Sequence, residues 1–123
     1  MNSHPSSTPT GSRLDIARGV GMMGSQAALC KILSTVLASM SADVSAIEAA
    51  LHAGDVANAN RLLHAIKGYM PIFGSDELVS QVIAVEKLSK TESAAVVLVH
   101  YQTLAPELRQ LLAEIHVFLN TGP

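Results

Sequence analysis

Apolar residues recur every three or four positions along several stretches of the chain, which is the spacing of one face of an α-helix. The longest such stretch begins at Ser25 and continues for about six helical turns. Its apolar positions are Leu29, Leu33, Val36, Met40, Val44, Ile47 and Leu51. The pattern predicts one long amphipathic helix with a single buried face.

Turn and capping residues divide the next part of the chain into two more helices. The sequence "HAGD" at 52–55 supplies a glycine that ends the long helix and Asp55, which can cap a helix from about Val56 to Met70. Ser75 can cap the following helix, and two acidic residues suit the positive end of its dipole. The apolar positions of that helix are Leu78, Val82, Val85 and Leu88.

A final helix is expected to begin near Thr91 or Glu92. Pro106 lies off its apolar face and should kink it, because the proline ring removes one backbone donor. The apolar positions are Val97, Tyr101, Leu104, Leu108, Leu111, Ile115 and Phe118. Four long helices with short connections predict an up-down antiparallel four-helix bundle of the all-α class.

The N-terminal part of the chain predicts one additional, shorter helix. It should start near Arg13 under a Ser12 cap and close at Gly21 and Gly24. Residues 1–12 are rich in Ser, Thr and Pro, which is typical of a disordered tail or an interdomain linker. The bundle domain is therefore expected over residues 13–120.

Composition narrows the functional classes. The chain has 123 residues, 49 % of them hydrophobic, and a net charge of −2, which argues against a nucleic-acid partner. A single cysteine, Cys30, allows no internal disulfide and suits a reducing compartment. No signal peptide and no apolar stretch of about 20 residues is found. We expect a cytoplasmic, monomeric domain without membrane insertion.

His64 is the candidate for chemistry, because helical geometry places it roughly 140° from the centre of the apolar face of its helix. Lys67 follows three residues later and Gly68 four residues later. A glycine inside a helix costs about 1 kcal/mol relative to alanine, which indicates a packing or functional reason for it. The alternatives are a boundary histidine, or a solvated histidine beside an unrelated glycine.

A functional interpretation explains these three residues together. A neutral imidazole is a good nucleophile near neutral pH, and attack on a phosphoryl group would form a phosphoramidate. Lys67 could neutralise the phosphoryl oxygens, and Gly68 would leave room for a bulky partner. The triplet therefore suits phosphoryl transfer between two protein surfaces.

The stretch "HAIKGYMPIFG" resembles the H-x-x-K-G signature of histidine-containing phosphotransfer domains of bacterial and fungal phosphorelays. Gly74, ten residues after the histidine, also matches the pattern, and the resemblance covers about residues 13–119. It implies that His64 accepts a phosphoryl group from the aspartyl phosphate of one receiver domain and passes it to another. Lys67 would stabilise the phosphate, and Gly68 would be the clearance residue.

The resemblance implies further site residues. Glu86 and Lys90 occupy positions that often face the histidine in relatives, and Arg61 flanks it from the preceding turn. The magnesium ion used in such a transfer belongs to the receiver domain, so no metal or cofactor is expected in this chain. A partner surface would include Ile16, Met22, Met23 and Tyr69, unless these residues simply cover the end of the bundle.

The sequence departs from the family pattern just after the glycine. Small residues are common there in relatives, whereas Tyr69, Met70 and Pro71 follow in this chain. Pro71 cannot donate to the carbonyl of Lys67, so the helix should bend or end just past the site.

Two other functions are weighed against the relay. One is a helical adaptor that binds a receiver or kinase domain without being phosphorylated. The other is a metal site, which would need Glu-x-x-His repeats on facing helices, and the chain contains no such motif. The remaining histidines are His4, His52, His100 and His116.

Overall fold

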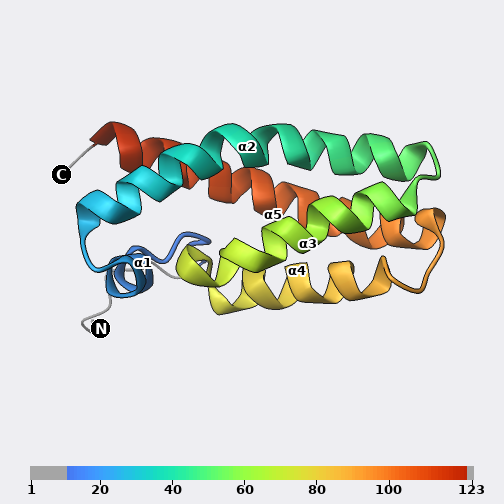
Figure 1. Ribbon diagram of the computed structural model, residues 1–123, viewed down its shortest axis with the longest axis horizontal. Coiled ribbons are helices and arrows are strands. Elements are labelled where there is room, and N and C mark those ends of the chain that lie inside the picture. Colours follow the sequence, from blue (N-terminus) through green and yellow to red (C-terminus); the bar gives the residue numbers. More distant parts are fainter. Residues whose placement is uncertain (1–10, 122–123) are drawn as a thin grey trace.

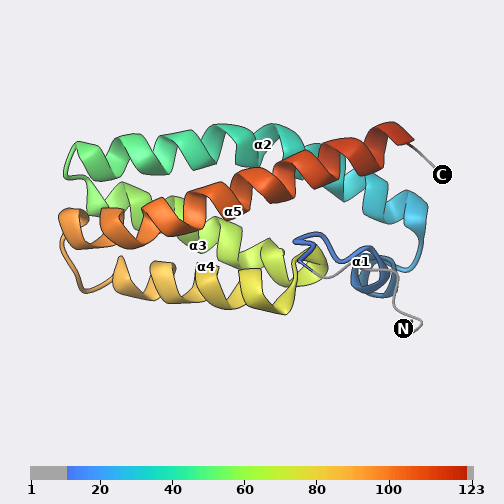
Figure 2. The ribbon, with the colours of Figure 1, turned by 180° about the vertical axis from the view of Figure 1, so that it is seen from behind.

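The computed structural model describes residues 11–121, which form five helices. They are α1 (Ile16–Met23), α2 (Gln26–His52), α3 (Val56–Phe73), α4 (Asp76–Leu88) and α5 (Ala94–Thr121). The four long helices alternate in direction, each beside the next along the chain (Figure 1), and α5 returns beside α2 (Figure 2). This confirms the predicted all-α, up-down antiparallel four-helix bundle with a short additional N-terminal helix.

The apolar faces predicted from residue spacing form the core. Every apolar position named for α2 is buried, as are those of α4 and α5 except Leu88 and Phe118, which are partly buried. Tyr101 is fully buried in the centre, and its hydroxyl donates a hydrogen bond to the carbonyl of Val44 at 2.7 Å. That bond satisfies the one polar atom that this large side chain brings into the core.

The N-caps predicted at Asp55 and Ser75 are confirmed, and Ser25, where the apolar pattern begins, caps α2 in the same way. The side chains of Ser25, Asp55 and Ser75 each accept a hydrogen bond from a backbone N–H in the first turn of α2, α3 and α4. The cap predicted at Ser12 is wrong, because Asp15 accepts from the N–H of Arg18 and α1 begins only at Ile16.

The predicted helix ends differ from the structure in three further places. Gly24 closes α1 with a φ of 93°, but Gly21 lies inside that helix. α3 continues through Pro71 to Phe73, because the buried Phe73 ring holds the last turn against the core. α5 begins at Ala94 because the amides of residues 90–92 still bond to carbonyls at the end of α4. α5 runs continuously through Pro106, and the kink there stays a prediction.

Residues Ser12–Asp15, here called the N-terminal strap, lie across the turn between α3 and α4. Leu14 pairs with Gly74 in an isolated antiparallel bridge, and the amide of Asp15 donates to the carbonyl of Phe73 at 2.7 Å. A Cβ atom on Gly74 would come within 2.8 Å of the Met70 sulfur, so the close approach requires glycine. The contact with Met70, four residues earlier on α3, therefore explains the glycine ten residues after His64.

A carboxylate from the far end of the chain holds the other side of the strap. Glu114 of α5 accepts hydrogen bonds from the Ser12 hydroxyl and from the amides of Arg13 and Leu14, each at 2.9 Å. Ser12, which is predicted to belong to the tail, thus contacts the bundle. The rest of the predicted tail, residues 1–10, lies outside the described residues.

By length and composition alone α2 could cross a membrane, since an 18-residue window in it has a mean hydropathy of 1.4. A core helix of a bundle meets the same criterion. The large apolar side chains of α2 lie at the buried positions named above, except Ile32 and Leu37, which are partly buried against the core, and its exposed positions are mostly alanine and serine. Its hydropathy is therefore accounted for by its place in the core.

Replacing Gly74 with alanine should lower the free energy of unfolding by about 1–3 kcal/mol, because the added methyl group meets the side chain and the carbonyl oxygen of Met70, which must shift. Gly21→Ala is the matched control, since a Cβ there meets nothing within 4 Å. Urea denaturation of both variants measures the difference. Equal stability of the two variants would show that Met70 can make room for a side chain at position 74.

Candidate functional site

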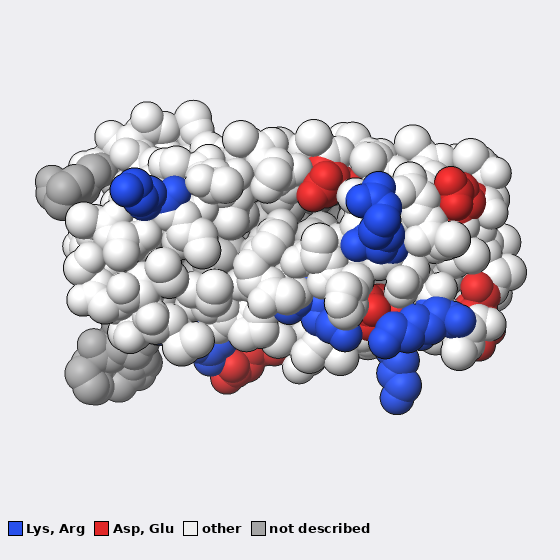
Figure 3. All heavy atoms as spheres, viewed as in Figure 1, with Lys and Arg blue, Asp and Glu red and all other residues white. Residues whose placement is uncertain are grey.

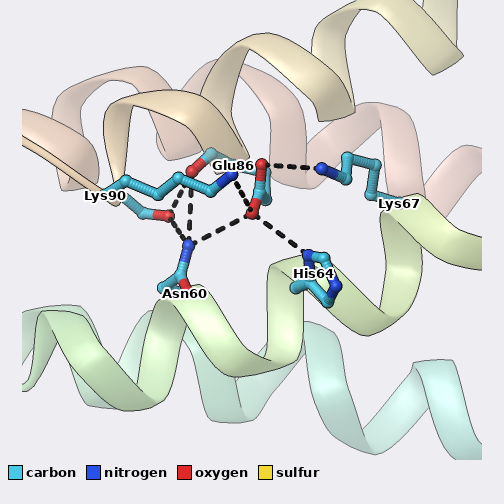
Figure 4. A network of polar contacts seen from close by, with 6 residues as sticks. Asn60, His64, Lys67, Glu86 and Lys90 are labelled. Atoms are coloured by element: carbon cyan, nitrogen blue, oxygen red, sulfur yellow. Dashed lines mark hydrogen bonds and ion pairs between the residues drawn. The ribbon is translucent and has the colours of Figure 1, made fainter.

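The candidate site lies where the middle of α3 packs against the last turns of α4 (Figure 4). His64 projects from α3 with 66 % of its side chain exposed, so it points away from the core as helical geometry predicts. Lys67 lies one turn further along and is 29 % exposed. The two side chains flank a glutamate from α4.

Glu86 is that glutamate, and only 2 % of its side chain is exposed. Its Oε2 atom lies 3.3 Å from Nδ1 of His64, and its Oε1 atom accepts from Nζ of Lys67 at 3.2 Å. Nζ of Lys90 lies 3.6 Å from Oε2. The structure thus places three of the predicted site residues around the carboxylate of a fourth.

The electrostatic environment keeps Glu86 ionised. Burial favours the neutral acid, but hydrogen bonds from Lys67 and His64 and the charges of Lys67 and Lys90 outweigh it, and they lower the pKa of Glu86. An ionised carboxylate only accepts hydrogen bonds, so Nδ1 of His64 must be the donor. In the neutral ring the lone pair then lies on Nε2, the nitrogen that faces away from Glu86.

Gly68 lies on the exposed side of α3, beyond the histidine. A Cβ atom built on it meets nothing within 4 Å, and its φ lies outside the left-handed region. Neither packing nor backbone conformation within the described chain therefore requires glycine at this position. Its effect is to leave the surface beside the imidazole open.

Arg61 is a charged residue predicted for the site whose side chain does not reach the carboxylate. Its guanidinium donates to the side-chain oxygen of Asn58 at 2.7 Å, on the exposed side of the helix. Asn60, the residue before it, lies on the Glu86 side instead. The side of the helix on which a residue lies, and not its closeness to His64 in sequence, decides which of these two neighbours joins the site.

The four residues predicted for a partner surface differ in exposure. Met22 is 62 % exposed, whereas Ile16 and Met23 are partly buried against the core. Tyr69 is also partly buried and stacks on Phe73 with ring centroids 6.0 Å apart. Its hydroxyl is buried without a hydrogen-bond partner in the described part of the chain, and burial raises its pKa.

Sequence reasoning did not assign a role to Asn60 or to Ser89, although both contact Glu86. The available signal was the spacing: Asn60 is four residues before His64, and Ser89 is three residues after Glu86. These positions place each residue on the same helical stripe as a site residue. This spacing identifies Asn60 and Ser89 as site residues only once it is known that α3 packs against α4.

Other parts of the described chain offer no competing catalytic cluster. Within residues 11–121 no group of three or more His, Cys, Asp or Glu side chains is placed to hold a metal ion. His52 lies 3.8 Å from Glu48, and His116 is within 3.1 Å of the Asn120 amide. A hollow of about 550 Å³ lies between the N-terminal strap, α4 and α5, and its lining does not include His64.

Fold and site together define a class: a helical bundle that presents a histidine on its surface, oriented by a buried carboxylate and flanked by lysines. Residues 31–117 match the model of the Hpt domain family. The chain therefore belongs to the Hpt domain family, which serves phosphotransfer in two-component signalling and acts with receiver domains. No curated protein and no solved structure matches the chain significantly.

Glu86→Gln should remove the part of the free energy of unfolding that depends on the ionised Glu86 carboxylate and therefore on pH. The pKa of Glu86 is lowered on folding, so the ionised carboxylate stabilises the folded state. This stabilisation is fully present above the unfolded-state pKa and is lost as the pH falls through the folded-state pKa. At neutral pH the variant should be less stable by about 1–3 kcal/mol, and this gap should shrink from about pH 5 downward.

Urea denaturation at several pH values measures that gap. Glu92→Gln is the control, since Glu92 is exposed and bonds to Thr91 at 3.4 Å. A gap between wild type and Glu86→Gln that stays constant with pH would contradict the assignment of an ionised, stabilising carboxylate.

Proposed function

We propose that this Hpt domain is a phosphorelay intermediate in which His64 carries the phosphoryl group. His64 accepts it from the aspartyl phosphate of one receiver domain and passes it to the aspartate of another. The observation that supports this most directly is the exposed imidazole whose Nδ1 is held by Glu86 at 3.3 Å, with Nε2 turned to solvent.

The chemical step follows from that orientation. Nε2 attacks the phosphorus atom, the N–P bond forms, and the P–O bond to the aspartate breaks with its electron pair returning to the carboxylate. The ring keeps its proton on Nδ1 and gains positive charge as the bond forms. Glu86 stabilises that charge, because its carboxylate is already in place and ionised. Donation to the second receiver domain is the reverse step.

The lysines supply the charge needed for the phosphoryl oxygens. Lys67 and Lys90 both lie within ion-pair distance of Glu86, so the cluster carries one net positive charge when His64 is neutral. An ammonium group has three donors, so Lys67 can keep its bond to Glu86 and still donate to an incoming phosphoryl oxygen. The magnesium ion belongs to the aspartate pocket of the receiver domain, so the role proposed for His64 and the lysines includes no metal ligand.

The surface around His64 suits a protein partner better than a small molecule. Gly68 leaves the approach to the imidazole open, and the two hollows seen in the described chain, beside the N-terminal strap and between α4 and α5, are lined by residues outside the site. On the face seen in Figure 3, most charged groups gather toward the end away from α1, and the α1 end is largely uncharged. We place the receiver domain over His64 and that uncharged end, where Met22 is exposed.

His64→Gln should abolish phosphoryl transfer while the bundle stays folded, because the side chain is exposed and contributes little to packing. The wild-type protein and the variant are each incubated with a phosphorylated receiver domain and Mg²⁺. Label on the wild type should be stable in alkali and labile in acid, and absent from the variant. Label persisting on the variant would refute the assignment of His64, and binding without transfer would favour the adaptor function.

Substituting Gly68 should separate the effect on transfer from the effect on stability. Gly68→Ala and Gly68→Gln should each raise the free energy of unfolding by up to about 1 kcal/mol, since helix propensity improves and no clash arises. Gly68→Gln should also slow transfer from the receiver domain, more than Gly68→Ala does, because its side chain fills the approach to His64. Transfer as fast as in wild type would remove clearance as the reason for this glycine.

A further inference from the structure

Asn60 joins the site from the turn of α3 that precedes His64. Its Nδ2 atom lies 2.8 Å from the Ser89 hydroxyl oxygen, 3.3 Å from Oε2 of Glu86 and 3.4 Å from the Glu86 carbonyl oxygen. The Ser89 hydroxyl in turn donates to that carbonyl at 2.5 Å. One side chain of α3 is thus bonded to the carboxylate, the backbone and the C-cap of α4.

The acceptors around Asn60 determine how its amide group is turned. The carboxylate and the carbonyl of Glu86 can only accept, and the Ser89 hydroxyl proton is already used on that carbonyl. The opposite amide orientation would place the Asn60 oxygen against these oxygens. Asn60 is therefore the donor at all three contacts, with one hydrogen shared between two acceptors.

The two lysines that contact Glu86 do not fix the orientation of its carboxylate, so a further donor is needed to do so. Lys67 bonds to Oε1, and Lys90 approaches Oε2 from α4 itself. Both are long side chains whose ammonium groups can follow a rotating carboxylate. Asn60 is short and is anchored to Ser89, which is 5 % exposed, so it holds Oε2 at one place. That place is within hydrogen-bond distance of Nδ1 of His64.

We propose that Asn60, anchored by Ser89, is a positioning residue that holds Oε2 of Glu86 against Nδ1 of His64 and so keeps the lone pair of the neutral ring on Nε2. The expected effect on phosphoryl transfer rests on the proposed function of His64, whereas the expected effect on the protonation of the His64 ring does not. Without the Asn60 donor, Glu86 turns toward the lysines, and the proton of the neutral ring distributes over both nitrogens.

The test compares Asn60→Ala, Asn60→Asp and Ser89→Ala with wild type. Asn60→Asp keeps the shape of the side chain but replaces its donor with a negative charge beside Glu86, whereas Asn60→Ala removes the donor without adding charge, so the same change in both variants separates the hydrogen bond from packing and from charge. Asn58→Ala is the matched control, because Asn58 lies on the same helix and its side chain bonds to Arg61 on the exposed side. Circular dichroism confirms that each variant is folded.

The first measurement is the ¹⁵N chemical shifts of the His64 imidazole at a pH where the ring is neutral. Wild type and Asn58→Ala should show mainly the Nδ1–H form. Asn60→Ala and Asn60→Asp should shift the ratio of the two forms toward Nε2–H by about three- to tenfold, the effect of losing one hydrogen bond. Ser89→Ala should shift it in the same direction.

The second measurement is the rate of phosphoryl transfer from a phosphorylated receiver domain, which should fall by about three- to tenfold in the same variants and stay unchanged in Asn58→Ala. An unchanged ratio of ring forms in folded Asn60→Ala and Asn60→Asp would overturn the positioning role and leave Asn60 as a structural tie between α3 and α4. If wild-type His64 accepts no phosphoryl group, the proposed function fails, whereas the ring measurement still decides the role of Asn60.

Discussion

A single buried carboxylate connects the two helices that build the site. Taking an ionised carboxylate out of water costs several kcal/mol unless partners compensate for it. Glu86 has those partners in Lys67, Lys90, Asn60 and the ring of His64. Asn60, His64 and Lys67 lie on α3, so their bonds to Glu86 would be lost if α3 and α4 changed register, and the charge therefore holds these helices in one arrangement. The orientation of the histidine is a consequence of that arrangement.

The site combines a fixed rear side with an open front. Behind the ring, Nδ1 is bonded to a carboxylate that is almost fully buried. In front, the ring is 66 % exposed, and Gly68 leaves the neighbouring surface free. A group held in this way needs no rearrangement before it reacts, and a surface of this shape admits the reacting group of another protein. The same features would give a small substrate little to bind.

The end of the bundle near α1 depends on contacts between distant parts of the chain. Glu114 of α5 holds the N-terminal strap, and the strap pairs with Gly74 at the end of the histidine helix. This links α1, with the exposed Met22, to the helix that carries the site. The Hpt family match begins at residue 31, so the strap and α1 lie outside the matched residues. Their attachment to the bundle is seen only in the structure.

The sequence alone determined the bundle, the helix caps at Asp55 and Ser75 and the outward direction of His64, because these follow from local spacing and from capping chemistry at the helix ends. It placed Lys67 and Gly68 beside the histidine for the same reason. Only the tertiary structure decided that Glu86, one residue beyond the apolar position Val85, is buried, and that Asn60 and Ser89 meet there. It also decided that Asp15 and not Ser12 caps α1, because Glu114 holds Ser12 from a position 102 residues away. Contacts of this kind depend on the register between helices. The packing of the whole core determines that register, and it cannot be predicted from a local pattern of residues.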